Sequence, residues 1–295
     1  MPVNMLNFSN VEMQHDWLVT PATQDSNNFD VYEIKPPENS LHRILKGVDV
    51  TKFGNIEEPK LEDSMGSLGL DNRRGFGIVM KVAWIDDSHL VVAYENGYVV
   101  TFEHSDSIQA VAFNSALSPE PVTSLLYDGA RDILLAASAS DKLCIIKASQ
   151  RGDTTSGTSI HHIRHRGIGD LAVSTDGTIG LITWDGYARF FHYNEDKTDV
   201  DFVFKVKRQM PSIADNRPNS TDDIKQQDFL HPQKSSVVAF SRTQVSYRKI
   251  KEQNQIEYNN GMSKNLIRRR LERDFDHHWM LIGYKDGRVA VYNVT

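Results

Sequence analysis

Histidines come closer than any other residues of this sequence to a metal-binding or catalytic pattern. Imidazole binds zinc and related metals, but a site also needs carboxylates or thiols at ligand spacing. The two groups of histidines lack such companions, and carboxylates such as Asp86 and Asp87 fall in predicted turns. We therefore interpret these histidines as strand-edge or loop residues. They are His161, His162 and His165, followed much later by His277 and His278.

Other reaction chemistries also lack their motifs. The chain contains no phosphate loop of the GxGxxG or GxxxxGKS/T type and no GxSxG elbow. Its single cysteine, Cys144, excludes CxxC zinc sites and a disulfide within the chain. Because Cys144 lies in the apolar run Leu143–Ile146, we predict that it is a small buried hydrophobe. The sequence thus predicts no catalytic residue, no metal and no cofactor, and hence no enzyme.

Composition narrows the class of partner. The chain has 295 residues and a net charge of -6, the sign opposite to that of a general nucleic-acid or anionic-membrane surface. No apolar run approaches the roughly 20 residues of a membrane span, and the first residues do not form a secretory signal. These features and the single cysteine predict a soluble intracellular protein, without choosing between nucleus and cytosol.

A recurring unit points to the elements that organise the chain. It consists of an apolar run, a turn with Asn-Gly or Asp-Gly, and an alternating run that ends near an aromatic residue. Asn-Gly and Asp-Gly suit a type I′ turn, so each unit predicts a tight hairpin of two strands. The aromatic residue lies five positions after the glycine, where WD40 repeats carry tryptophan. The units are residues 90–103, 179–192 and 280–293, with aromatic residues Phe102, Phe191 and Tyr292.

Two further copies are less regular. Residues 134–147 form a degenerate copy in which Lys142 takes the glycine position, and residues 17–33 form another. Gly97, Lys142 and Gly186 are 45 and 44 residues apart, which matches the period of WD40 blades. The literal Trp184-Asp185 dipeptide lies at a hairpin turn and is interpreted as a turn Asp after a strand-end aromatic.

Each hairpin is flanked by an apolar segment on either side. The candidate inner strands are residues 3–8, 79–84, 122–126, 168–173 and 237–240, and the candidate outer strands are residues 41–45, 110–113, 160–164 and 202–206. We therefore predict an all-β, WD40-like β-propeller over residues 1–295, with about five recognisable blades. The strand order favours membership of a seven-bladed ring whose first one or two blades precede this sequence. The alternative is a five-bladed or irregularly closed ring.

Three insertions do not fit the blade period. Residues 47–75 are polar and predict a long loop, while residues 207–234 contain three prolines and predict disorder. Residues 242–277 are basic and include a possible short helix. That helix either binds an acidic partner or nucleic acid, or is a solvated or packed element. The weak partner-binding candidates there are Lys264, Arg268, Arg269, Arg270 and Arg273.

Several stretches resemble the ASTRA-associated protein 1 family. They are residues 3–8, residues 165–173 with 180–191, and residues 283–292. The resemblance implies a scaffold subunit of the nuclear, chromatin-linked ASTRA assembly. It implies protein partners, namely Tel–Tti co-chaperone proteins, Rvb-type AAA+ ATPases and a large kinase-like scaffold. The implied role is the assembly or maturation of phosphatidylinositol-3-kinase-related kinases. The alternative is another WD40 adaptor, such as a ubiquitin-ligase substrate receptor or a trafficking-complex subunit.

Overall fold

The computed structural model describes most of the chain as β-strands joined by turns. The described residues are 8–37, 40–53, 75–105, 107–149, 157–207, 235–241, 263 and 279–294. They form strands β1–β19 and one short 3-10 helix, η1 (Val50–Lys52). In these ranges no helix has the length and apolarity needed to cross a membrane.

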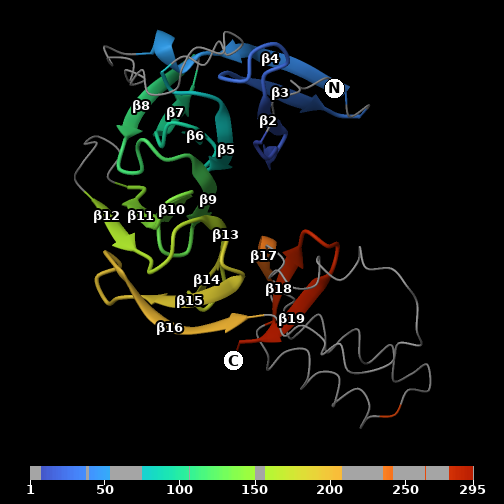
Figure 1. Cartoon of the computed structure of the whole chain (residues 1–295). Helices are drawn as coiled ribbons and strands as arrows, with labels where there is room; N and C mark the ends of the chain where they lie inside the picture. The colour runs from blue at the N-terminus through green and yellow to red at the C-terminus, as the bar shows by residue number, and fades with distance from the viewer. Residues whose placement is uncertain are drawn as a thin grey trace, which may run out of the picture. The chain divides into compact units, whose positions relative to one another are not determined.

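The strands form five sheets, and the strands within each sheet are consecutive in the chain (Figure 1). The first sheet contains β1 (Glu12–Gln14), β2 (Trp17–Pro21), β3 (Phe29–Lys35) and β4 (Ser40–Val48). The second contains β5 (Val79–Trp84), β6 (His89–Tyr94), β7 (Val99–His104) and β8 (Ile108–Asn114). The third contains β9 (Val122–Asp128), β10 (Ile133–Ser138), β11 (Lys142–Lys147) and β12 (Thr158–His162).

The last two sheets follow the same plan. The fourth contains β13 (Ile168–Val173), β14 (Ile179–Thr183), β15 (Tyr187–Tyr193) and β16 (Val200–Lys207). The fifth has three strands in the described residues, β17 (Ser235–Phe240), β18 (Trp279–Tyr284) and β19 (Val289–Asn293). Five antiparallel sheets of this kind confirm the predicted all-β, propeller-like fold class. The number of blades in a closed ring stays a prediction.

The chain divides into two compact units. The first comprises residues 1–169 with 194–200, and the second comprises residues 170–193 with 201–295. The first three sheets belong to the first unit, and the fourth and fifth sheets lie almost wholly in the second.

The middle strands explain how neighbouring sheets pack within a unit. Every residue of β10 and of β14 is buried, and so is β6 after its first residue. Along β6 the side chains alternate between two cores. Leu90, Val92 and Tyr94 pack with residues of the first sheet, such as Val19 and Phe29. The intervening residues of β6 join a different core, formed with the third sheet, to which they contribute Val91 and Ala93.

Burial on both faces accounts for the unbroken apolar runs that the sequence shows before each turn. A strand with one solvated face alternates apolar and polar residues, whereas a strand covered on both faces is apolar throughout. The second unit follows the same rule, because Ile182 and Phe190 of the fourth sheet pack against Met280 and Ile282 of the fifth.

The predicted strands match the structure closely, with one displacement at the start. The predicted inner strands of the second and fourth sheets, residues 79–84 and 168–173, coincide with β5 and β13. The predicted first inner strand, residues 3–8, is not where the first sheet begins. Residues 1–7 lie outside the described residues, Phe8 is not in a strand, and the sheet starts at β1.

The hairpin turns differ from the predicted type I′. In the β6–β7 turn, Gly97 N–H donates to the Tyr94 carbonyl and Tyr94 N–H donates to the Tyr98 carbonyl. Gly97 has φ of +77°, whereas Asn96 is not among the residues with positive φ. A type I′ turn requires positive φ at both central residues, so this loop is a type I turn with a G1 bulge. The β18–β19 turn has the same bonds between Tyr284 and Gly287 or Arg288.

The degenerate hairpin closes without a glycine. Ala137 pairs with Leu143 as Ala93 pairs with Val99, so the register places Asp141, rather than Lys142, at the glycine position. Serine side chains support this loop instead. Ser140 N–H donates to Ser138 Oγ at 3.2 Å, and Lys142 N–H donates to Ser140 Oγ at 3.3 Å. Hydroxyl groups often hold turns in this way, which removes the need for positive φ.

The predicted insertions lie mostly outside the described residues. Of residues 47–75, Gly47 and Val48 complete β4 and η1 follows, while residues 54–74 are not described. Lys207 ends β16, and residues 208–234 are not described. Within residues 242–277, only Ser263 is described, and it is exposed.

Gly97 and Gly287 have nearly the same positive φ but different surroundings. Substituting each of them therefore separates the effect of backbone conformation from that of packing. A Cβ on Gly97 would lie 2.5 Å from Ser118 N, whereas a Cβ on Gly287, at φ +78°, meets nothing within 4 Å. We expect Gly287→Ala to lower the free energy of unfolding by about 1 kcal/mol and Gly97→Ala by about 3 kcal/mol or more. Urea denaturation followed by circular dichroism measures both. Equal losses would contradict the backbone clash at Gly97.

The predicted burial of Cys144 is confirmed. Its side chain is fully buried, and desolvation raises the pKa of the thiol to about 12 despite the opposing charge of Lys142. Because the thiolate is the reactive form, we expect Cys144 to resist a thiol reagent such as dithionitrobenzoate in the folded protein at pH 8. The reagent should react fully in denaturant. Rapid labelling of the native chain would show that the third sheet opens locally.

Candidate functional site

Two of the candidate histidines each pair with a different carboxylate. His161 Nδ1 is 2.7 Å from Asp199 Oδ1, and His162 Nδ1 is 3.1 Å from Asp141 Oδ2. Both pairs join β12 to a neighbouring loop, as expected of strand-edge histidines. Within the described part of the chain, no three His, Cys, Asp or Glu residues are grouped closely enough to hold a metal ion. His277, His278 and the five basic candidates from Lys264 to Arg273 lie outside the described residues.

Two polar side chains connect innermost segments of neighbouring sheets. Asn10 Nδ2 donates to the Val82 carbonyl at 2.9 Å, and Val82 N–H donates to Asn10 Oδ1 at 2.9 Å. In the second unit, Val238 N–H donates to Asp170 Oδ2 at 3.0 Å. An inner strand has unpaired backbone groups along its free edge, and these side chains satisfy some of them. They therefore position one sheet against the next inside each unit.

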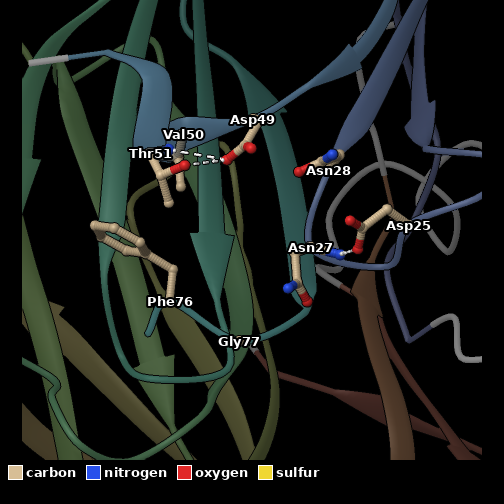
Figure 2. A pocket seen from close by; sticks show the side chains of 8 residues that line it. All are labelled: Asp25, Asn27, Asn28, Asp49, Val50, Thr51, Phe76 and Gly77. Carbon is tan, nitrogen blue, oxygen red and sulfur yellow. Dashed lines mark hydrogen bonds between the residues drawn. The ribbon is translucent and has the colours of Figure 1, made fainter. Parts of the chain in front are cut away.

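A pocket opens in the first unit where the loops of the first sheet meet the start of the second. Its cavity volume is about 10 Å³, roughly the space that one water molecule needs, and it is partly open to solvent. Its residues come from the β2–β3 loop, from the segment after β4 and from the segment before β5. Figure 2 shows the Phe76 ring and Thr51 on one side and the side chains of the β2–β3 loop on the other. The lining residues are Asp25, Asn27, Asn28, Asp49, Val50, Thr51, Phe76 and Gly77.

Local hydrogen bonds hold the pocket in place. Asp49 Oδ1 accepts from Thr51 N–H at 3.0 Å and from the Thr51 hydroxyl at 2.7 Å, which caps η1. Asp25 Oδ1 accepts from Asn27 N–H at 3.2 Å (Figure 2). Val79 N–H donates to the Ser26 carbonyl at 2.9 Å, which ties the β2–β3 loop to the second sheet.

The pocket combines an apolar base with unpaired negative charge. Val50 and Phe76 are almost fully buried and form the apolar part of its lining. Asp25 and Asp49 each use one oxygen for a local bond, and neither has a cationic partner in the described residues. The cavity is too small to take in a Lys or Arg side chain, but Asp25 is exposed at its rim. The arrangement can therefore attract a basic group of another protein to this rim, where its charge meets a carboxylate.

An ion pair between buried Arg189 and partly buried Asp185 lies at the hairpin of the fourth sheet. Arg189 Nη2 donates to Asp185 Oδ2 at 2.6 Å, and Nη1 donates to Asp185 Oδ1 at 3.0 Å. The Thr183 hydroxyl lies between them and donates to Asp185. Burial raises the pKa of Asp185, but the bonds from Arg189 and Thr183 outweigh this effect and hold the pKa well below its ordinary value of 3.8.

This ion pair confirms the interpretation of Trp184-Asp185 as a turn motif. Asp185 lies in the turn between β14 and β15 and also accepts from Tyr187 N–H at 3.2 Å, while Trp184 is 46% exposed. The sequence contains a signal that predicts the Asp185–Arg189 bond. Asp185 and Arg189 are four residues apart across a two-stranded turn, which brings their side chains to the same face.

Comparisons with known proteins match almost the whole chain to one family. The family model described as ASTRA-associated protein 1 matches residues 1–292. The ASTRA-associated protein 1 of Komagataella phaffii is 30% identical over 305 residues, which cover 99% of this chain and 65% of that protein. Those of Scheffersomyces stipitis and Candida tropicalis are 24% and 26% identical, and each alignment covers 100% of this chain and 76% of the relative. This chain thus spans just under two thirds of the K. phaffii protein.

The Asp185–Arg189 pair predicts a specific dependence of stability on pH. Because the pKa of Asp185 is lower in the folded protein than in the unfolded chain, its contribution is complete above pH 3.8 and decreases as the pH falls below it. We expect Asp185→Asn to cost about 3 kcal/mol at pH 7, since it leaves Arg189 buried without a counter-charge. The difference in the free energy of unfolding between this variant and the wild type should decrease by about 1.4 kcal/mol for each pH unit below pH 4.

The matched control removes both charges. Asp185→Asn combined with Arg189→Met should recover more than half of the single-variant loss, because no buried charge is then unpaired. Urea denaturation at pH 7, 4 and 3 measures all three proteins. If the difference in unfolding free energy between Asp185→Asn and the wild type stayed constant from pH 7 to pH 3, the assigned role of Asp185 would be contradicted.

Proposed function

We propose, because the chain belongs to the ASTRA-associated protein 1 family, that it is a non-catalytic scaffold subunit of an ASTRA-like complex. The observation that carries the proposal is the match of the family model to residues 1–292. It is supported by a relative named ASTRA-associated protein 1 that aligns with 99% of this chain.

The architecture suits such a role. Antiparallel sheets packed face to face make a stiff support, and their connecting loops present side chains at fixed positions. The pocket lined by Asp25, Asp49 and Phe76 is one such position, because two connections, β2–β3 and β4–β5, build it and local bonds hold it. We infer that a basic group of a partner subunit docks at its rim, against Asp25.

The partners of the proposed subunit are proteins. We propose Tel–Tti co-chaperone proteins, Rvb-type AAA+ ATPases and a large kinase-like scaffold, in the nucleus. The proposed work is the assembly or maturation of phosphatidylinositol-3-kinase-related kinases, linked to chromatin regulation. The chain would act as a WD-repeat scaffold that holds its partners in place, without a reaction of its own.

Affinity purification of the tagged chain from its native cells, followed by quantitative mass spectrometry, tests the proposal. We expect Tel–Tti or Rvb-type proteins among the enriched partners, and nuclear fluorescence for a tagged chain. Enrichment of a cullin or of coat proteins instead would overturn the proposal and favour a ubiquitin-ligase receptor or a trafficking subunit.

A charge-reversal variant tests the role of the pocket in the same affinity purification. Asp25→Arg should lower the recovery of at least one partner severalfold, because it places a positive charge where a basic side chain is expected. Asp196→Arg is the control, since Asp196 is also an exposed turn aspartate but lies on the β15–β16 loop. Equal recovery with both variants would remove the pocket from the interface and leave the scaffold role standing.

A further inference from the structure

Positive charge gathers around one aromatic ring on the fourth sheet. The ammonium nitrogens of Lys205 and Lys207 lie 4.8 and 4.9 Å from the centre of the Tyr187 ring. The guanidinium carbon of Arg189 lies 5.4 Å from the same centre. Alternate residues of a strand share a face, so β16 presents both lysines together and β15 presents Tyr187 with Arg189. We call Tyr187, Lys205 and Lys207 the Tyr187 patch.

The charge of the Tyr187 patch is not balanced locally. Asp185, the carboxylate of this hairpin turn, has both of its oxygens bonded to Arg189, which is only 3% exposed. Lys205 and Lys207 are exposed, and neither has a carboxylate partner in the described residues. The chain as a whole has 39 acidic and 33 basic residues, so this local excess runs against its composition. Two positive charges are thus held against a ring, without a counter-charge in the part of the chain that the structure describes.

Apolar side chains lie beside these charges on the same elements. Val203, which shares the face of Lys205 and Lys207 on β16, is 44% exposed, and Trp184 in the turn before β15 is 46% exposed. Exposed aromatic residues next to cations are typical of binding surfaces, because they supply contact area while the charges select the partner. β16 is also the last strand in the order β13-β14-β15-β16, so one of its edges is free within its sheet.

We propose that the Tyr187 patch binds an acidic, extended peptide segment of a partner protein. Lys205 and Lys207 are two residues apart on a strand, so they are separated by about 6.6 Å along it. Alternate residues of an extended peptide have the same spacing, which places two carboxylates opposite the two lysines. The free edge of β16 allows the segment to run along the strand, as in β-strand addition. This inference deepens the proposed function, since it names the surface by which the scaffold would hold one partner.

The test uses the purified full chain and a synthetic probe. The probe is a fluorescein-labelled peptide of alternating Glu and Thr, about twelve residues long, and binding is followed by fluorescence anisotropy. We expect saturable binding that weakens with added salt, and no binding of the same peptide with Gln in place of Glu. Lys205→Glu combined with Lys207→Glu should raise the Kd at least about tenfold, because two attractions become repulsions.

Matched variants make the result specific. Lys46→Glu combined with Lys285→Glu changes the net charge by the same amount at two exposed lysines that have no carboxylate partner among the described residues, so the Kd should change less than about twofold. Tyr187→Phe keeps the ring and should bind like the wild type. Tyr187→Leu removes the surface that holds the ammonium groups and should raise the Kd about threefold.

Several outcomes would overturn the proposal. These are no binding of the acidic peptide, equal loss in both double-lysine variants, and tighter binding of single-stranded DNA that the Lys205 and Lys207 substitutions abolish. Recovery of ASTRA proteins by the tagged chain without peptide binding would refute the Tyr187 patch alone. Peptide binding without recovery of those proteins would refute the scaffold assignment and leave the patch in place.

Discussion

The middle strands β6, β10 and β14 are buried on both faces along almost their whole length, and the rest of the structure depends on this fact. Val91 and Val92 are neighbours on β6, yet one belongs to the core shared with the third sheet and the other to the core shared with the first. A sheet with such a strand cannot bury its own surface. It needs cover on either side: for β6 the first and third sheets provide it, and the fifth sheet covers one face of β14.

Polar side chains lie at the sheet edges, turns, loops and outer strand that the apolar packing does not fill. Asn10 and Asp170 satisfy the free edges of inner segments, where the next sheet approaches but cannot pair strand to strand. Arg189 is buried, and the hairpin brings the partly buried Asp185 against it. The unpaired charges of Asp25, Asp49, Lys205 and Lys207 lie at loops and on an outer strand. Water reaches those places, and so can another protein.

The limits of sequence reasoning are clearest at the turns. Asn96-Gly97 fits a type I′ turn and a G1-bulge loop equally well as a dipeptide, and only the register of Tyr94 with Tyr98 distinguishes them. Counting residues from one repeat to the next places Lys142 at the glycine position. The pairing of Ala137 with Leu143 places Asp141 there instead. A shift of one residue leaves the repeat period almost unchanged, so the period could not reveal it. Serine hydroxyl groups replaced the glycine, and that substitution has no fixed sequence spacing.

The sequence by itself determined the class of fold, the position of most strands, the burial of Cys144 and the family. These depend on alternation, on local turn chemistry and on a repeat of about 45 residues, all of which act over short distances along the chain. The tertiary structure decided which charges are paired and which are free. Asp25, Asp49 and Phe76 form one pocket, and Tyr187 meets Lys205 and Lys207, although none of these groups is continuous in sequence. Strand pairing and sheet packing bring them together, and no local pattern encodes the partner that a distant side chain will find.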